Sequence, residues 1–75
     1  MCSLPAISGK TAIAAFSKAG FVVKRVTASH HIVKKDGHRV LLSIPVHGNK
    51  ALKPGTLRAL IRDAGLTVAE FVELL

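Results

Sequence analysis

The chain has 75 residues, of which eleven are Lys or Arg and four are Asp or Glu, so its formal net charge is +7 and its pI is near 10.4. With 49% hydrophobic residues, it is too apolar for a disordered basic tail, and it lacks the roughly 18 consecutive uncharged apolar residues that span a membrane. We therefore expect one small folded domain over residues 1–75 that makes no membrane contact, holds no cofactor and binds a large partner at a basic surface.

The first half of the chain predicts a helix followed by two β-strands. Ser8 is placed to cap a helix whose apolar face includes Ile13 and Phe16, and Gly20 follows as its C′ residue. β-branched residues then dominate residues 21–26 and 31–33, which indicates strands.

A third strand is predicted over residues 38–44, with Val40, Leu42 and Ile44 on one face. The Asp36–Gly37 pair before it predicts a hairpin with a type I′ turn, which needs positive φ at both central residues. His38, directly after the turn glycine, is expected to be solvated.

Two further helices are predicted after Pro45. Pro54 suits a first helical position, and the apolar residues after it recur at helical spacing. Thr67 and Glu70 form a capping box for a short last helix. The order α-β-β-β-α-α predicts an α+β fold, in which a three-stranded antiparallel sheet carries its helices on one face.

Positive charge is concentrated before residue 63. Residues 1–62 hold all eleven basic residues and one acid, whereas residues 63–75 hold three acids and no base. This excess favours a nucleic acid partner, with an acidic protein as the main alternative. The chain has three Phe and no Trp or Tyr, so phosphate contacts are a better source of affinity than base stacking. We expect these contacts from Lys24, Arg25, Lys34, Lys35, Lys53, Arg58 and Arg62, although a solvated helix face explains the two arginines equally well.

Two motif-like features are rejected. The segment 8–11 resembles the end of a phosphate-binding loop, but Leu4 stands where that loop needs glycine and no strand precedes it. The four histidines match no zinc-binding spacing, so we expect no metal site. The single cysteine, Cys2, cannot form an intrachain disulfide, and no signal peptide is evident, which favours a cytoplasmic location.

The segment from Thr27 to His31 carries the most reactive side chains. It joins two predicted strands, has basic residues on both sides, and contains imidazoles, which change charge near neutral pH. RNA carries its own nucleophile, the 2′-OH, so a base beside a phosphate-binding surface suffices to cleave it. The alternative is structural: one histidine lies on the strand surface and the other packs.

Four short segments, in order along nearly the whole chain, resemble those of one protein family. They are Lys18–Phe21 (K-A-G-F), Ser29–Ile32 (S-H-x-x), Ile44–His47 (x-P-x-H) and Leu52–Leu57 (L-K-x-G-T-L). The sequence thereby resembles the HicA family of mRNA interferases from bacterial toxin–antitoxin systems.

This resemblance implies a fold like that of double-stranded-RNA-binding domains, metal-independent cleavage of mRNA and inhibition by a HicB-type antitoxin. The family's catalytic histidine follows Gly-Ser and corresponds to His30, which would act as general base on the 2′-OH. The implied products are a 2′,3′-cyclic phosphate and a 5′-OH, and DNA is expected to bind without being cut. Ser29, His31 and His47 are candidate catalytic or supporting residues, and His30 and His31 could exchange roles.

The sequence departs from the family pattern at Ala28, where the family has glycine. Glycine permits positive φ and a close backbone approach to phosphate, and alanine restricts both. Two other functions therefore stay open: an RNA-binding module of the same fold without activity, and a basic protein-interaction domain.

Overall fold

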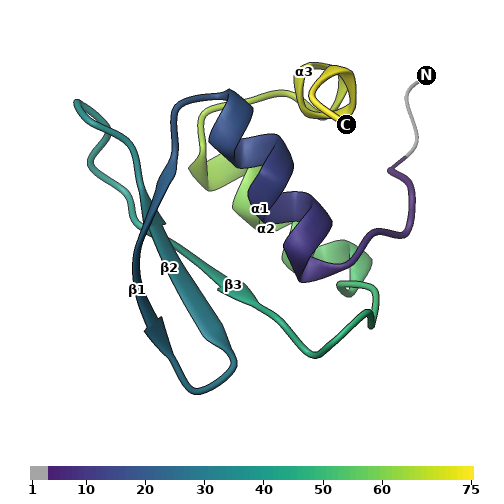
Figure 1. Ribbon diagram of the computed structural model, residues 1–75. Helices are drawn as coiled ribbons and strands as arrows, with labels where there is room; N and C mark the ends of the chain where they lie inside the picture. The colour runs from purple at the N-terminus through teal and green to yellow at the C-terminus, as the bar shows by residue number, and fades with distance from the viewer. Residues whose placement is uncertain (1–3) are drawn as a thin grey trace.

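The computed structural model describes residues 4–75, so Cys2 lies outside the described part. Its elements are α1 (Gly9–Lys18), β1 (Val22–Thr27), β2 (His30–Lys34), β3 (Leu42–Pro45), α2 (Pro54–Asp63) and α3 (Val68–Glu73). The strands form one antiparallel sheet in the order β1-β2-β3. The helices lie to one side of this sheet, and the β1–β2 hairpin extends away from them (Figure 1). The predicted α+β fold is confirmed.

The helix ends follow the predicted capping residues. The Ser8 hydroxyl accepts a hydrogen bond from the Thr11 amide at 3.3 Å, and Pro54 is the first residue of α2. In α3 the capping box is complete, because the Glu70 amide donates to the Thr67 hydroxyl at 3.1 Å and the Thr67 amide donates to the Glu70 carboxylate at 2.8 Å.

The core lies between the helices and β3. Phe16 of α1 is fully buried, with its ring centre 5.0 Å from that of Phe71 and 5.8 Å from that of Phe21. Leu42 and Ile44 of β3 are buried beneath the helices. Full burial of one such side chain contributes about 1.5–3 kcal/mol, so β3 is anchored by its packing. By contrast, all six residues of β1 are exposed.

The segment between β2 and β3 differs from the prediction. The third strand begins at Leu42, and Val40 is 43% exposed. Gly37 has a φ of 81°, but Asp36 is not among the described residues with positive φ, so the turn is not of type I′.

The physical reason for this difference is a contact of His38. Its Nε2 atom lies 2.7 Å from the Asp63 carbonyl oxygen at the end of α2, and its ring packs edge-on against Phe21, with 5.5 Å between ring centres. These contacts hold residues 35–41 as a loop. His38, which the sequence predicts to be solvated at the start of a strand, is therefore half-buried.

Candidate functional site

The β1–β2 turn consists of Ala28 and Ser29 alone, because Thr27 pairs with His30 across it. Ala28 has a φ of 51°, a left-handed conformation that costs an L-residue about 1–2 kcal/mol. Alanine thus occupies here the backbone conformation for which glycine is favoured. The Ser29 carbonyl oxygen accepts a hydrogen bond from the Val46 amide at 2.6 Å, which ties the turn to the chain after β3.

His30 is exposed and begins β2 on the face of the sheet that the helices do not cover. We call this the outer face. Partners in a sheet share a face, so His30 lies there with Thr27 and Pro45. Arg25 and Lys34 lie on the same face, because Arg25 pairs with Ile32 and Lys34 follows His30 by four residues. At about 3.3 Å per residue, His30 and Lys34 are about 13 Å apart along the strand.

His31 points to the opposite face of the sheet. It pairs with Val26 and with the buried Ile44, and it is half-buried. Its Nδ1 atom is buried and has no hydrogen-bond partner among the described residues. The two adjacent histidines are therefore not in equivalent places, and only His30 shares a face with Arg25 and Lys34.

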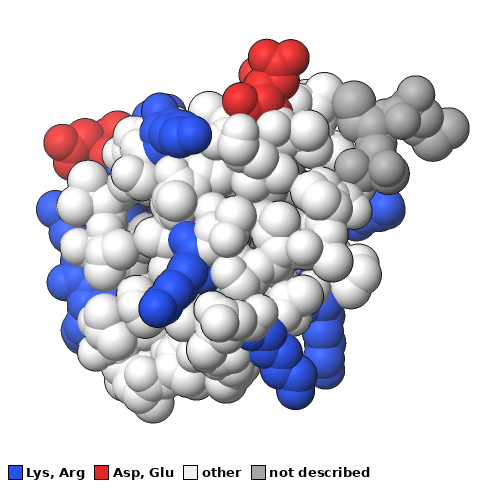
Figure 2. Space-filling model, turned by 45° about the vertical axis from the view of Figure 1, so that its right-hand side comes forward, with Lys and Arg blue, Asp and Glu red and all other residues white. Residues whose placement is uncertain are grey.

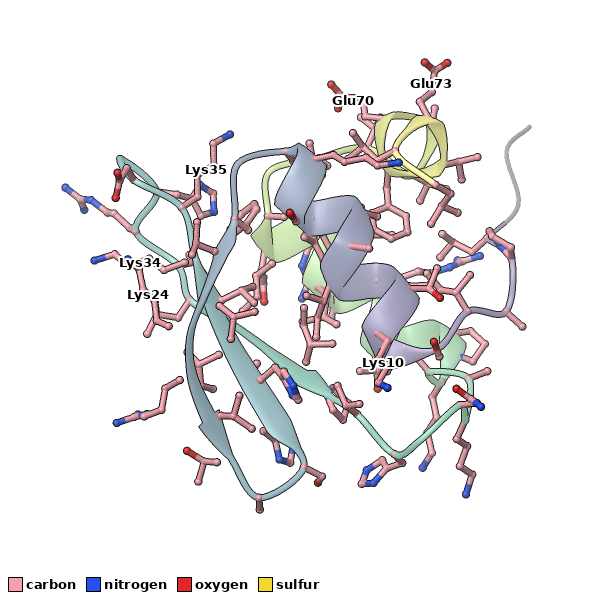
Figure 3. All side chains as sticks on the ribbon, in the orientation of Figure 1. Lys10, Lys24, Lys34, Lys35, Glu70 and Glu73 are labelled. Carbon is pink, nitrogen blue, oxygen red and sulfur yellow. The ribbon has the colours of Figure 1, made fainter. Side chains whose placement is uncertain are left out.

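The first turn of α1 lies beside the end of β3. Gly9 is buried, and a Cβ atom there would overlap the Pro45 carbonyl oxygen and come within 3.0 Å of a Val46 methyl group. This close approach brings Lys10 to the end of the molecule that carries the β1–β2 turn, as the labelled side chain in Figure 3 shows. We call this end, formed by residues 9–10, 28–30 and 45–47, the turn edge.

Lys10 is a candidate that sequence reasoning missed. The sequence offered one signal that the start of α1 has a close neighbour, namely Gly9, since glycine disfavours a helix interior. It did not indicate that this neighbour is the end of β3.

A depression of about 360 Å³ adjoins the turn edge. Its residues come from the end of β3, the loop that follows and the first turn of α2. They are Pro45, His47, Lys50, Ala51, Leu52, Lys53 and Thr56. The Lys50 amide donates to the His47 carbonyl oxygen at 3.0 Å, and this tight turn places His47 and Lys50 at the same rim.

The other predicted RNA-binding residues lie in two separate places. Lys24, Lys34 and Lys35 line a hollow of about 250 Å³ at the end of the hairpin opposite the turn, and Figure 3 shows Lys24 and Lys34 projecting from the hairpin away from the helices. Lys24 stands at a bulge in β1, and the Lys35 ammonium lies 5.9 Å from the centre of the Phe21 ring. Arg58 and Arg62 are exposed on α2 and line neither the depression nor this hollow.

Charge is distributed unevenly over the surface. In Figure 2 the acidic side chains stand in two places near the upper end, with a basic side chain between them, whereas Lys and Arg dominate the side and the lower edge. Glu70 and Glu73 lie on α3, remote from the β1–β2 turn (Figure 3). No polar or charged residue of the described range 4–75 is buried. The cationic groups are therefore at the surface, where they can meet a polyanion.

Within residues 4–75, no three His, Cys, Asp or Glu side chains gather as metal ligands would, and no helix there is long and apolar enough to cross a membrane.

The family model for the HicA toxin of bacterial toxin–antitoxin systems matches residues 9–66. This range includes the turn edge, the depression and the outer face of the sheet. No curated protein matches the chain.

Proposed function

Because the chain belongs to the HicA family of bacterial toxins, we propose that it is an endoribonuclease that cleaves mRNA without a metal ion and so blocks translation. Family membership makes it the toxin of a toxin–antitoxin system, and such a toxin has a cognate antitoxin. The proposal adds the chemistry. The observation that carries it is the placement of His30, which is exposed on the outer face and shares that face with Arg25 and Lys34.

In the proposed reaction, the His30 imidazole removes the proton from a ribose 2′-OH. The 2′ oxygen then attacks the adjacent phosphorus, the bond from phosphorus to the 5′ oxygen breaks, and that oxygen leaves with a proton taken from an acid or from water. The products are a 2′,3′-cyclic phosphate and a 5′-OH. Positioned base catalysis of this kind contributes about 10²–10⁴-fold to a rate.

The other groups of the site have supporting parts in this proposal. Lys24, Arg25, Lys34 and Lys35 bind phosphates along the hairpin, and Lys53, Arg58 and Arg62 do so along α2. Lys10 stabilises the charge that develops on the reacting phosphate, because it lies at the turn edge with His30. His47 is the candidate acid at the depression, and Ser29 holds the turn in shape through its carbonyl bond to Val46.

His31 has a structural part in this proposal. Its place beside Ile44, on the face toward the helices, supports packing over proton transfer. We further propose that the antitoxin is of the HicB type and that the toxin acts in the cytoplasm, where mRNA is available.

The activity is tested by incubating the purified protein with RNA in excess EDTA and analysing the ends of the products. We expect 5′-OH and cyclic-phosphate ends, and we expect DNA, which lacks the 2′-OH, to stay intact. RNA that stays intact would reject the enzymatic proposal. If the same RNA still binds with steep salt dependence, the chain is an RNA-binding module instead. The observation that supports this second function is the left-handed backbone conformation of Ala28, which is unfavourable for alanine.

The role of His30 is tested by the substitution His30→Ala. We expect cleavage to fall at least about 10²-fold, because the base is lost, while RNA affinity stays within about twofold, because binding depends on Lys and Arg. His31→Ala is the matched control and should retain cleavage in molecules that remain folded. Cleavage that survives His30→Ala but not His31→Ala would assign the base to His31.

A further inference from the structure

The depression beside the turn edge differs from the outer face of the hairpin because apolar residues form part of its lining. Its lining combines three apolar residues, Pro45, Ala51 and Leu52, which we call its floor, with His47, Lys50, Lys53 and Thr56. An apolar lining with a few polar and cationic groups is typical of a small-molecule site. At about 360 Å³, it is near the lower end of the range for such sites, roughly 300–1,000 Å³.

The depression is next to His30 in the fold. Pro45, which forms one wall, is the strand partner of His30, and partners in an antiparallel pair have Cα atoms only about 4.5–5.5 Å apart. A phosphate held at His30 therefore places the neighbouring nucleotide at the depression. The hollow lined by Lys24, Lys34 and Lys35 lies at the far end of the hairpin, so it cannot take that neighbour.

The floor of the depression is fixed by backbone contacts. The Leu52 amide donates to the Ile7 carbonyl oxygen at 2.8 Å, and Ala51 pairs with Ser8 in an isolated bridge. Leu52 is also part of the core. The shape of the floor is thus preformed, which lowers the entropic cost of binding.

We propose that this depression binds the base of one unpaired nucleotide next to the cleaved bond, so that the substrate is single-stranded or looped RNA rather than continuous duplex. This inference rests on the proposed function. The base packs on Pro45, Ala51 and Leu52, while Lys50 and Lys53 bind the flanking phosphates. A base within a duplex is paired and stacked on both faces, and it must leave the stack before it can enter such a site.

The test compares a single-stranded oligoribonucleotide with the same strand annealed to its complement. Binding of both is measured by fluorescence anisotropy to the His30→Ala protein, which removes cleavage from the measurement. We expect the single strand to bind about tenfold more tightly, the effect of a contact worth about 1.4 kcal/mol. Equal affinities, or a preference for the duplex, would overturn the proposal.

A second substitution then fills the depression. Ala51→Leu, in the His30→Ala background, should remove the preference for the single strand and leave duplex affinity unchanged. Ala69→Leu is the matched control, because Ala69 is equally an exposed alanine but lines a hollow on α3 with Glu70 and Glu73. Should Ala51→Leu fail to fold, as judged by circular dichroism, Lys50→Ala replaces it and should weaken single-strand binding more than duplex binding. Unchanged discrimination in the folded variant would reject the site.

The two proposals fail in different ways. If the wild-type protein leaves all RNA intact but the single-strand preference disappears with Ala51→Leu, the cleavage proposal is wrong and the nucleotide site stands. If the wild-type protein cleaves single-stranded and duplex RNA at equal rates, and Ala51→Leu alters neither rate, the site is wrong and the cleavage proposal stands.

Discussion

Ala28 is the residue at which sequence and backbone conformation disagree most. Its φ of 51° is the one positive value among non-glycine residues in the described range, and it lies in a two-residue turn directly before the candidate base. We expect Ala28→Gly to stabilise the protein by about 0.5–1 kcal/mol, because the relief of the left-handed conformation exceeds the added entropy of the unfolded chain. For a domain of this size, the midpoint of thermal unfolding should rise by about 2–8 °C.

The same substitution elsewhere supplies the control for Ala28. Ala14 is an exposed position inside α1, and Ala14→Gly should lower stability by about 1 kcal/mol. Both changes are followed by thermal denaturation. If the two variants lose stability alike, the turn does not hold Ala28 in the left-handed region. The positive φ of Ala28 is a backbone conformation that suits glycine better than alanine.

Gly9 gives the second prediction at the scale of single residues. A Cβ at this position would overlap the Pro45 carbonyl oxygen, so Gly9→Ala must push the start of α1 away from β3. We expect a loss of about 1–3 kcal/mol, the range for overpacked sites, and a weakened turn edge. A methyl group at Gly55, in α2, would meet no surrounding atom within 4 Å, so Gly55→Ala should be neutral or stabilising. Chemical denaturation measures both, and equal effects would contradict the close approach.

At the scale of elements, local signals in the sequence determined the helices and the first two strands. Ser8, Pro54 and the Thr67–Glu70 pair act within a few residues of themselves, so their effects could be predicted without tertiary contacts. The strand over residues 38–44 could not be predicted correctly, because His38 contacts a carbonyl 25 positions later in the chain. The position of Lys10 could not be predicted either, because it also depends on a contact between segments far apart in the sequence. Only the fold brings the start of α1 to the end of β3.

The His38 contact leads to the prediction at this scale. His38→Ala removes the hydrogen bond to the Asp63 carbonyl oxygen and the edge-on contact with Phe21. Each contributes about 0.5–1.5 kcal/mol, so we expect a loss of about 1–3 kcal/mol in the free energy of unfolding, measured in urea. His30→Ala is the comparison, because His30 is exposed at the outer face and should change stability by less than about 0.5 kcal/mol. Equal losses would mean that His38 does not hold the loop.

At the scale of the whole molecule, the fold separates two tasks. The helices bury their apolar residues against β3 and against Val33 of β2, whereas β1 is left free of that packing, with every β1 residue exposed. A hairpin of this kind presents a long surface to a polymer, and the hydrophobic core stays intact because it lies on the other side of the sheet. The acids of α3 lie away from that face (Figure 3), so they add little repulsion toward a polyanion at the turn edge. Asp36 lies at the other end of the hairpin, where it lines the hollow with Lys24, Lys34 and Lys35.

This arrangement predicts that the position of a positive charge, and not net charge alone, sets RNA affinity. Lys34 lies on the outer face with His30, whereas Lys18 is exposed at the end of α1 and lines neither basic hollow. Lys34→Gln and Lys18→Gln change the net charge equally. Log affinity for single-stranded RNA falls linearly with log salt concentration, and the loss of one phosphate contact makes this line shallower by about 0.7. We expect the shallower line for Lys34→Gln and almost no change for Lys18→Gln, measured by anisotropy over a salt series with the His30→Ala protein. Identical slopes in the two variants would mean that RNA responds to the overall charge of the molecule and that the outer face has no special part in binding.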